Sequence, residues 1–142
     1  MIKENEILLF ENEVTFENLI KIFNEVSIDA RINPDGRLRV QDERLVIYVE
    51  VFPSIKLMRF CTFFKFDDNA STDTKYTFIN SLNERVKLAR FAIDTDEASF
   101  SSDYRLPYNN AIPIWTIIVA LRHFEKATLM GLKEMDEAGM VR

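Results

Sequence analysis

The chain has 142 residues, of which 47% are hydrophobic and 29% charged, and its formal net charge is −5. This length and composition fit one globular domain with its own core, and the 3 glycines and 4 prolines leave little room for disordered linkers. The negative charge argues against non-specific binding to nucleic acid or anionic lipid, and the single cysteine excludes an internal disulfide or a cysteine metal cluster.

We expect a single domain over residues 1–142, with a lead-in segment at 1–13, a core at 14–137 and a tail at 138–142. The start of the chain lacks the pattern of a signal peptide, and no apolar run approaches the ~20 residues that span a membrane. The expected location is therefore cytoplasmic, away from membranes.

The first part of the chain predicts one amphipathic helix after the acidic lead-in. The apolar residues 7–10 of the lead-in predict either a short strand or a turn. Thr15 is placed to cap the helix, which should end near Ser27. The apolar residues of this helix recur at helical spacing: Phe16, Leu19, Ile20, Phe23 and Val26.

Residues 30–66 predict a meander of three or four antiparallel strands. Asn33-Pro34-Asp35-Gly36 is a strong turn signal, because proline fixes φ and glycine admits a positive φ. The long hairpin 44–66, which turns at 52–54, carries apolar side chains on both faces, so we expect both faces to need cover.

The second half of the chain predicts helix, two strands and helix. A capped helix is expected at 73–86, followed by strands at 87–93 and 98–106, and then by a helix that Asn109 or Asn110 caps. The first two turns of this last helix are apolar all round and should be buried. The resulting fold class is α+β, an antiparallel sheet of about five strands packed by helices in the order α-β-β-β-α-β-β-α.

This element order and four motifs resemble the YbjN family of bacterial proteins. The motifs are Pro34-Asp35-Gly36, Phe78-Ile79-Asn80-Ser81-Leu82-Asn83, Leu88-Ala89-Arg90-Phe91-Ala92-Ile93-Asp94 and Tyr104-Arg105-Leu106-Pro107. The resemblance covers residues 14–126. Asp96-Glu97 departs from the family pattern, which has a glycine at this turn, and this puts the tightness of the turn in question.

The resemblance implies a fold like that of type III secretion chaperones, which are small, acidic, often dimeric and bind partner polypeptides without chemistry. YbjN proteins themselves are described as regulators of sensory transduction with no agreed reaction. The resemblance therefore transfers no catalytic residue to this chain.

No motif in the sequence predicts a catalytic, cofactor-binding or metal-binding site. His123, the only histidine, is expected to be a solvated or half-buried helix residue, and Cys61 a buried inert thiol. Asp67-Asp68-Asn69 lacks the glycine and the terminal glutamate of a calcium loop, so we interpret it as a helix-capping loop. Alternation places Asp103 on the surface, as it does the carboxylates of the turn at 94–97.

Asn80 and Asn83 lie in the predicted second helix, although asparagine is a poor helix former. Two interpretations are open for them. They are either exposed to solvent, or one of them makes a structural hydrogen bond to a neighbouring strand or to the loop at Tyr108-Asn109.

One face of the long hairpin is the candidate partner-binding surface, because aromatic residues with arginine and few acids are typical of protein interfaces. By alternation, the residues that share this face are Val46, Tyr48, Phe52, Leu57, Arg59 and Phe63. The competing interpretation is that the last helix covers this face internally.

We therefore expect a non-enzymatic protein-binding module, a chaperone-like or regulatory adaptor of the YbjN type that binds another protein and forms a homodimer. Residues 30–66 hold 7 basic and 4 acidic residues, which favours an acidic partner. The alternative is a small-molecule-binding protein or an enzyme with a pocket between helices and sheet. Nucleic-acid binding through the sheet aromatics is disfavoured by the net charge of −5.

Overall fold

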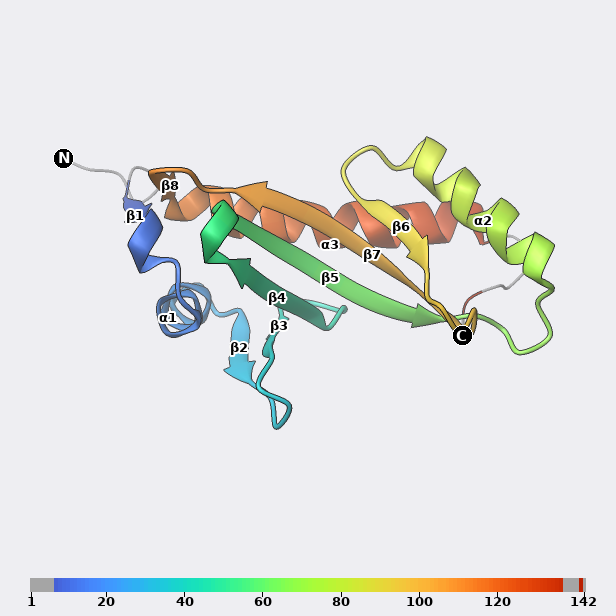
Figure 1. The fold of residues 1–142 in the computed structure, drawn as a ribbon, viewed down its shortest axis with the longest axis horizontal. Coiled ribbons are helices and arrows are strands. Elements are labelled where there is room, and N and C mark those ends of the chain that lie inside the picture. Colours follow the sequence, from blue (N-terminus) through green and yellow to red (C-terminus); the bar gives the residue numbers. More distant parts are fainter. Residues whose placement is uncertain (1–6, 137–140, 142) are drawn as a thin grey trace. The chain divides into compact units, whose positions relative to one another are not determined.

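The computed structural model describes residues 7–136 and 141 (Figure 1). No helix among these residues is long and apolar enough to cross a membrane. The first half of the described chain contains β1 (Leu8–Phe10), η2 (Glu11–Glu13), α1 (Phe16–Glu25), β2 (Asp29–Ile32), β3 (Leu38–Gln41), β4 (Ile47–Phe52), η3 (Pro53–Ile55) and β5 (Leu57–Lys65). The second half contains α2 (Thr72–Arg85), β6 (Arg90–Ile93), β7 (Ser99–Pro107), β8 (Ala111–Pro113) and α3 (Ile114–Met135).

The strands form a larger sheet in the order β2-β3-β4-β5-β7-β6 and a small sheet that joins β1 to β8. The pairs β1–β8, β2–β3, β3–β4 and β6–β7 are antiparallel. The predicted α+β class with an antiparallel sheet is confirmed. The larger sheet has six strands rather than about five, and the lead-in segment contains both a strand and a 3-10 helix.

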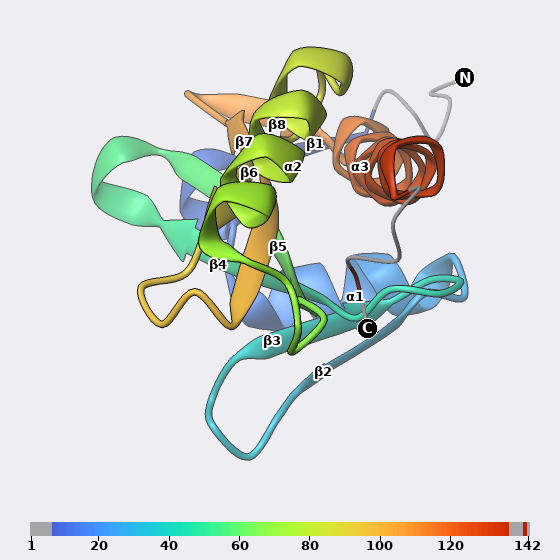
Figure 2. The same cartoon turned by 90° about the vertical axis from the view of Figure 1, so that its right-hand side faces the viewer.

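The chain divides into two compact units, each built from two separate segments. Unit 1 comprises residues 1–60 and 105–122, and unit 2 comprises residues 61–104 and 123–142. The strands β5 and β7 and the helix α3 therefore contribute one part to each unit (Figures 1 and 2). The single domain expected over 1–142 stays a prediction.

In unit 1, α1 begins and ends where its flanking residues predict. The Thr15 Oγ1 accepts a hydrogen bond from the Asn18 N–H at 3.2 Å, which confirms the predicted cap. Beyond the helix, Ser27 has a left-handed φ of 65°. Leu19 and Phe23 of α1 are fully buried, so the apolar face of the helix belongs to the core of unit 1.

The strands of unit 1 bury one face and leave the other partly exposed. The predicted turn between β2 and β3 is confirmed: Gly36 has a φ of 82°, and its N–H donates to the Asn33 carbonyl at 2.9 Å. Along β3, β4 and β5, alternate residues are 0–2% exposed: Leu38, Val40, Ile47, Val49, Met58 and Phe60. The residues between them on β4 and β5 are half-buried or exposed in unit 1, so the second face of the hairpin, which was expected to need cover as well, is only partly covered there.

The start of α3 differs from the prediction that Asn109 or Asn110 caps it. The intervening residues form β8, which pairs with β1, so the helix begins at Ile114, whose N–H donates to the Ile7 carbonyl at 2.8 Å. Asn110 lies in the turn before β8 with a φ of 67°, and its N–H donates to Glu11 Oε2 at 3.0 Å.

The apolar composition of the first turns of α3 predicted that they are buried all round, and this prediction is wrong. Ile117, Ile118 and Leu121 are buried, whereas Trp115 is 42% exposed and Thr116 is exposed. One apolar side chain of these turns therefore faces away from the core of unit 1, and the helix presents only part of its surface to that core.

In unit 2, Phe100 of β7 is the centre of an aromatic cluster. Its ring centroid lies 5.2 Å from that of Phe64, 4.8 Å from Phe66, 5.9 Å from Phe78 and 6.5 Å from Phe91. These separations are those of favourable aromatic pairs. Five phenylalanines therefore pack together in this unit.

The helix α2 begins at a cap, as predicted. Ser71 Oγ accepts a hydrogen bond from the Thr74 N–H at 3.2 Å. Tyr76 is 48% exposed and lies outside the buried face of the helix. The residues of the helix that do face the core are Phe78, Ile79 and Leu82.

The turn from β6 to β7 closes tightly although it lacks a glycine. The Glu97 N–H donates to the Asp94 carbonyl at 2.9 Å, and the Asp94 N–H donates to the Ser99 carbonyl at 2.9 Å. Glu97 itself adopts a left-handed φ of 57°, the conformation for which glycine is the usual residue. Its carboxylate accepts a hydrogen bond from Thr72 Oγ1 at 3.1 Å.

Candidate functional site

The strand register of unit 1 places arginines beside a tyrosine. Arg31 of β2 lies opposite Arg39 of β3, and Arg39 lies opposite Tyr48 of β4. Directly opposed residues in an antiparallel pair share one face, so these three side chains lie in a row across the sheet. The guanidinium of Arg37 lies over the ring of Tyr48, 4.1 Å from its centroid, in a cation–π contact.

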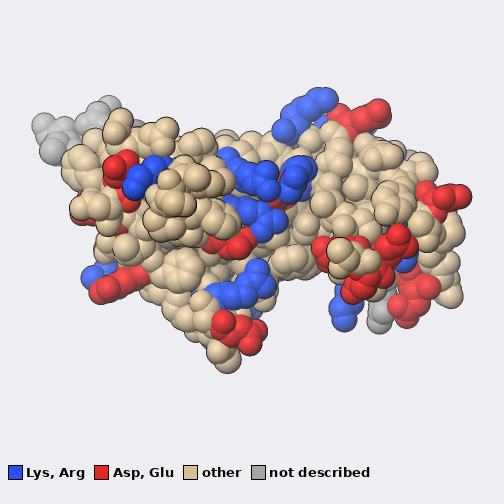
Figure 3. Space-filling view, in the orientation of Figure 1, with Lys and Arg blue, Asp and Glu red and all other residues tan. Residues whose placement is uncertain are grey.

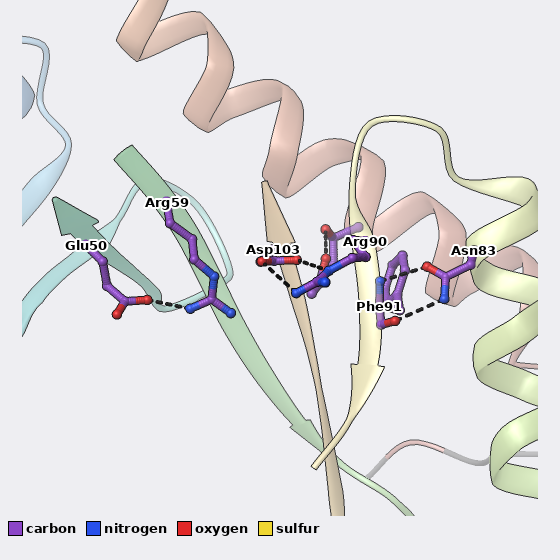
Figure 4. Close-up of polar contacts among 8 residues, drawn as sticks. Glu50, Arg59, Asn83, Arg90, Phe91 and Asp103 are labelled. Carbon is purple, nitrogen blue, oxygen red and sulfur yellow. Dashed lines mark hydrogen bonds and ion pairs between the residues drawn. The ribbon is translucent and has the colours of Figure 1, made fainter. Parts of the chain in front are cut away.

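Three further arginine contacts lie beside this row. Arg39 Nη1 lies 3.9 Å from Asp29 Oδ2, and its Nη2 donates to Gln41 Oε1 at 3.1 Å. Arg59 of β5 forms an ion pair with Glu50 of β4 (Figure 4). We call this surface the outer face of unit 1: Asp29, Arg31, Arg37, Arg39, Gln41, Tyr48, Glu50 and Arg59.

The outer face is partly exposed and rich in arginine. Arg31 is exposed, and the side chains of Arg39 and Arg59 are 22% and 20% exposed. Figure 3 shows basic side chains among uncharged and acidic ones over the strands on this side. Four arginines and two carboxylates make the outer face net positive, although the whole chain carries −5.

The structure places the six predicted partner-binding residues as follows. Five belong to unit 1, namely Val46, Tyr48, Phe52, Leu57 and Arg59, and Phe63 belongs to unit 2. Val46, Tyr48, Leu57 and Arg59 are half-buried, whereas Phe52 and Phe63 are 36% and 44% exposed. None of the six is fully buried. Their role in binding stays a prediction.

His123 lies on α3 as expected, with its side chain exposed. In unit 2 it lines an open pocket of about 290 Å³ together with Leu88, Lys126, Ala127 and Met130. Within residues 7–136 and 141, no three His, Cys, Asp or Glu side chains are grouped as metal ligands. The small-molecule or enzymatic alternative stays a prediction.

Cys61 is fully buried, as expected, and the inertness of its thiol stays a prediction. The Asp67-Asp68-Asn69 segment forms a turn before α2: Asp67 Oδ1 accepts a hydrogen bond from the Asn69 N–H at 3.0 Å. This geometry agrees with the interpretation of a loop that leads into a capped helix.

The expectation that Asp103 lies on the surface is wrong. Asp103 is only 4% exposed, and its carboxylate accepts hydrogen bonds from Arg90 Nε at 3.2 Å and Arg90 Nη2 at 3.4 Å (Figure 4). Ser101 and Ser102 beside it are also buried. Four consecutive residues of β7, Phe100 to Asp103, are buried, so both faces of this strand are covered here and alternation does not separate its buried from its exposed residues.

The two asparagines of α2 differ in the structure. Both are exposed, and the side chain of Asn83 in addition makes two hydrogen bonds to the backbone of Phe91 (Figure 4). Asn83 Oδ1 accepts from the Phe91 N–H at 2.8 Å, and Asn83 Nδ2 donates to the Phe91 carbonyl at 3.0 Å. The predicted hydrogen bond from one asparagine to a neighbouring strand is therefore confirmed.

Comparison of the sequence with protein-family models and with curated proteins finds no match. Comparison of the structure finds YbjN from E. coli, described as a proposed transcription regulator, with a TM-score of 0.72 and 8% sequence identity over 90% of this chain and 96% of that one. An uncharacterized protein from Methanothermobacter thermautotrophicus matches with a TM-score of 0.64 and 15% identity over 85% of this chain and 96% of that one. Identities this low show the fold alone. The chain therefore has a YbjN-like fold.

Proposed function

We propose that this chain is a non-enzymatic adaptor, chaperone-like or regulatory, that binds an acidic segment of another protein on the outer face of unit 1. The observation that carries this proposal is the row of Arg31, Arg39 and Tyr48 across three strands, with Arg37 stacked on the tyrosine ring. The likeness to YbjN, a proposed transcription regulator, fits such a role. We further propose that the chain acts as a cytoplasmic homodimer.

The chemistry of the outer face favours a carboxylate-bearing polypeptide. A planar guanidinium pairs with a carboxylate through two parallel hydrogen bonds, and stacking on an aromatic ring holds it in one orientation beforehand. Arginine and tyrosine are also the residues that most often dominate the binding energy of protein interfaces. The excess of arginines would attract an acidic segment and speed its association.

The environments of the reactive side chains support a non-enzymatic role. His123 is exposed on its helix, and Cys61 is fully buried. The one buried aspartate of β7, Asp103, is held by two hydrogen bonds from Arg90. A general acid or base must lie within hydrogen-bond reach of the proton that it transfers, and the carboxylate of Asp103 is already engaged by Arg90.

The proposal is tested by fluorescence anisotropy with a labelled peptide rich in glutamate and leucine, and with a lysine-rich peptide of equal length as the control ligand. We expect the glutamate peptide to bind more tightly, and Arg31→Glu and Tyr48→Ala each to weaken its binding about fivefold or more. Lys21→Glu makes the same charge change on an exposed residue of α1, and it should alter the affinity less than twofold, within about 0.4 kcal/mol.

Equal affinity for both peptides, or equal effects of Arg31→Glu and Lys21→Glu, would refute the proposal. Circular dichroism of each variant establishes that the fold is retained. The dimer is tested separately by sedimentation of the wild-type chain, where a monomeric mass at all concentrations would contradict it.

A further inference from the structure

The side chain of Asn83 occupies the place of a neighbouring strand at one edge of the larger sheet. β6 is the last strand of that sheet, and within the described residues its one partner strand is β7, with Phe91 opposite Ser102. The N–H and C=O of a residue in an antiparallel pair point to the same side, and those of Phe91 both bond to Asn83 rather than to β7. A carboxamide carries the same donor and acceptor as a peptide group, so Asn83 satisfies the outward edge at Phe91.

Asn24 makes the same contact at the other edge, within unit 1. β2 is the first strand of the sheet, and in the part of the chain that the structure describes it pairs with β3 alone, with Ala30 opposite Val40. Asn24 Oδ1 accepts a hydrogen bond from the Ala30 N–H at 3.1 Å, and its Nδ2 donates to the Ala30 carbonyl at 3.4 Å. Asn24 lies in the last turn of α1, as Asn83 lies in the last turn of α2.

The hairpins that follow the two helices match residue by residue. Each edge strand has four residues, and the asparagine bonds to the second of them. The turn begins directly after the fourth, at Asn33 and at Asp94. Three residues later, Gly36 and Glu97 have left-handed φ values of 82° and 57°, and their N–H groups donate to Asn33 and Asp94 at 2.9 Å.

We infer that Asn24 and Asn83 close the two edges of the larger sheet against strand addition, so that neither edge pairs with a second copy of this chain or with an extended peptide. An exposed edge presents its outward N–H and C=O groups at every second residue. A four-residue strand has two such residues, and the asparagine occupies the first. Only Ile32 at one edge and Ile93 at the other then remain, too few for the ladder that strand addition requires.

This inference does not depend on the proposed function, because it concerns the edges and not the outer face. Amide hydrogen exchange by NMR and sedimentation velocity test it on the full chain, with Asn24→Ala, Asn83→Ala and the double variant. The control variants are Glu25→Ala and Asn80→Ala, which alter exposed residues of the same two helices.

We expect the Phe91 amide to exchange about tenfold faster in Asn83→Ala, and the Ala30 amide about tenfold faster in Asn24→Ala, because each loses its acceptor. The amides of Arg90 and Ala92, which face β7, should keep their protection. The double variant should sediment at a higher mass than the wild type, and this mass should rise with concentration. Both control variants should behave as the wild type does.

Unchanged amide exchange at Phe91 and Ala30 in the variants would overturn the inference. Faster exchange at these amides would also overturn it if the double variant has the same mass as the wild type. If Asn83→Ala loses protection throughout β6, the variant has lost its fold. Asn83→Ser then replaces it, because its short hydroxyl side chain cannot reach both backbone groups, and the same two outcomes decide.

Discussion

Gly131 of α3 marks a close approach between two segments of unit 2. A Cβ atom at this position would lie 2.4 Å from Val86 Cγ2 and 3.6 Å from Leu82 Cδ2. Non-bonded carbon atoms are at optimal separation near 3.5–4.0 Å, so the first contact is a severe overlap and the second is ordinary packing. The perturbation that tests this packing is Gly131→Ala.

Two opposing effects decide the stability of Gly131→Ala. Alanine favours a helix over glycine by about 1 kcal/mol, which would stabilise the variant if nothing stood in the way. Overpacking of a core costs about 1–3 kcal/mol, and Val86 is β-branched and only 9% exposed, so it has little freedom to move aside. We therefore expect Gly131→Ala to lower the free energy of unfolding by about 1 kcal/mol.

The same substitution should have the opposite effect once the overlapping methyl group is removed. Val86→Ala alone should destabilise the chain by about 2 kcal/mol through lost burial. Within the Val86→Ala background, Gly131→Ala should then raise the free energy of unfolding by about 1 kcal/mol, since only the gain in helix propensity remains. The coupling between the two positions is the difference, about 2 kcal/mol.

Urea denaturation followed by circular dichroism measures these four free energies of unfolding. The decisive result is the change of sign between the two backgrounds. Gly131→Ala stabilising the wild-type chain would show that Val86 yields without strain. An equal loss in both backgrounds would place the cause outside the contact with Val86.

Three further predictions concern other buried or strained positions. The buried hydroxyl of Tyr108 has no hydrogen-bond partner within the described part of the chain, so Tyr108→Phe should raise the free energy of unfolding by about 1 kcal/mol in urea titrations at neutral pH. Burial, and secondarily the negative charge of Glu11, raise the pKa of Tyr108 above 10.0. The wild type should therefore lose stability as the pH rises through this raised pKa, and Tyr108→Phe should lose less. Equal losses of stability in the two proteins would contradict the assignment. Glu97→Gly should be about 1 kcal/mol more stable than Glu97→Ala, because both remove the carboxylate and only glycine relieves the left-handed φ; equal urea midpoints would show that the φ carries no strain. Phe100→Ala should destabilise the chain by about 3–5 kcal/mol in the same assay, and a loss below about 1 kcal/mol would mean that the aromatic cluster re-packs around the gap.

Much of the fold could be predicted because local signals and burial patterns agree along most of the chain. Thr15 caps a helix whose apolar spacing is helical, and Gly36 stands at the one position of its turn that needs a positive φ. The alternation in β4 also identified the face that contains Tyr48, which is half-buried while Ile47 and Val49 are buried. The arginine neighbours of Tyr48 depend on strand register, which the spacing of the strands did not determine.

The features that the sequence did not predict depend on contacts between distant residues. β8 forms because β1, some hundred residues earlier, pairs with it, and nothing local to Asn109 and Asn110 distinguishes this pairing from a helix cap. Asp103 was expected on the surface because a carboxylate at an alternating position usually lies there. Its burial follows from the cover on both faces of β7, where four consecutive residues are buried, and from the hydrogen bonds of Arg90.

The two helix–hairpin segments are equivalent in their backbone geometry, yet no repeat is visible in the sequence. What the geometry requires is mostly backbone conformation, and different residues meet that requirement: glycine takes the left-handed position in one turn and glutamate in the other. The asparagine that bonds to the edge strand is the exception, because only a carboxamide offers a donor and an acceptor at the spacing of a peptide group. Asparagine therefore recurs in the last turn of both helices, six residues before Ala30 and eight before Phe91. The sequence separation between asparagine and edge strand differs in the two segments, so a search for a fixed period does not find them. The shared feature becomes visible when the hydrogen bonds of the two edge strands are compared.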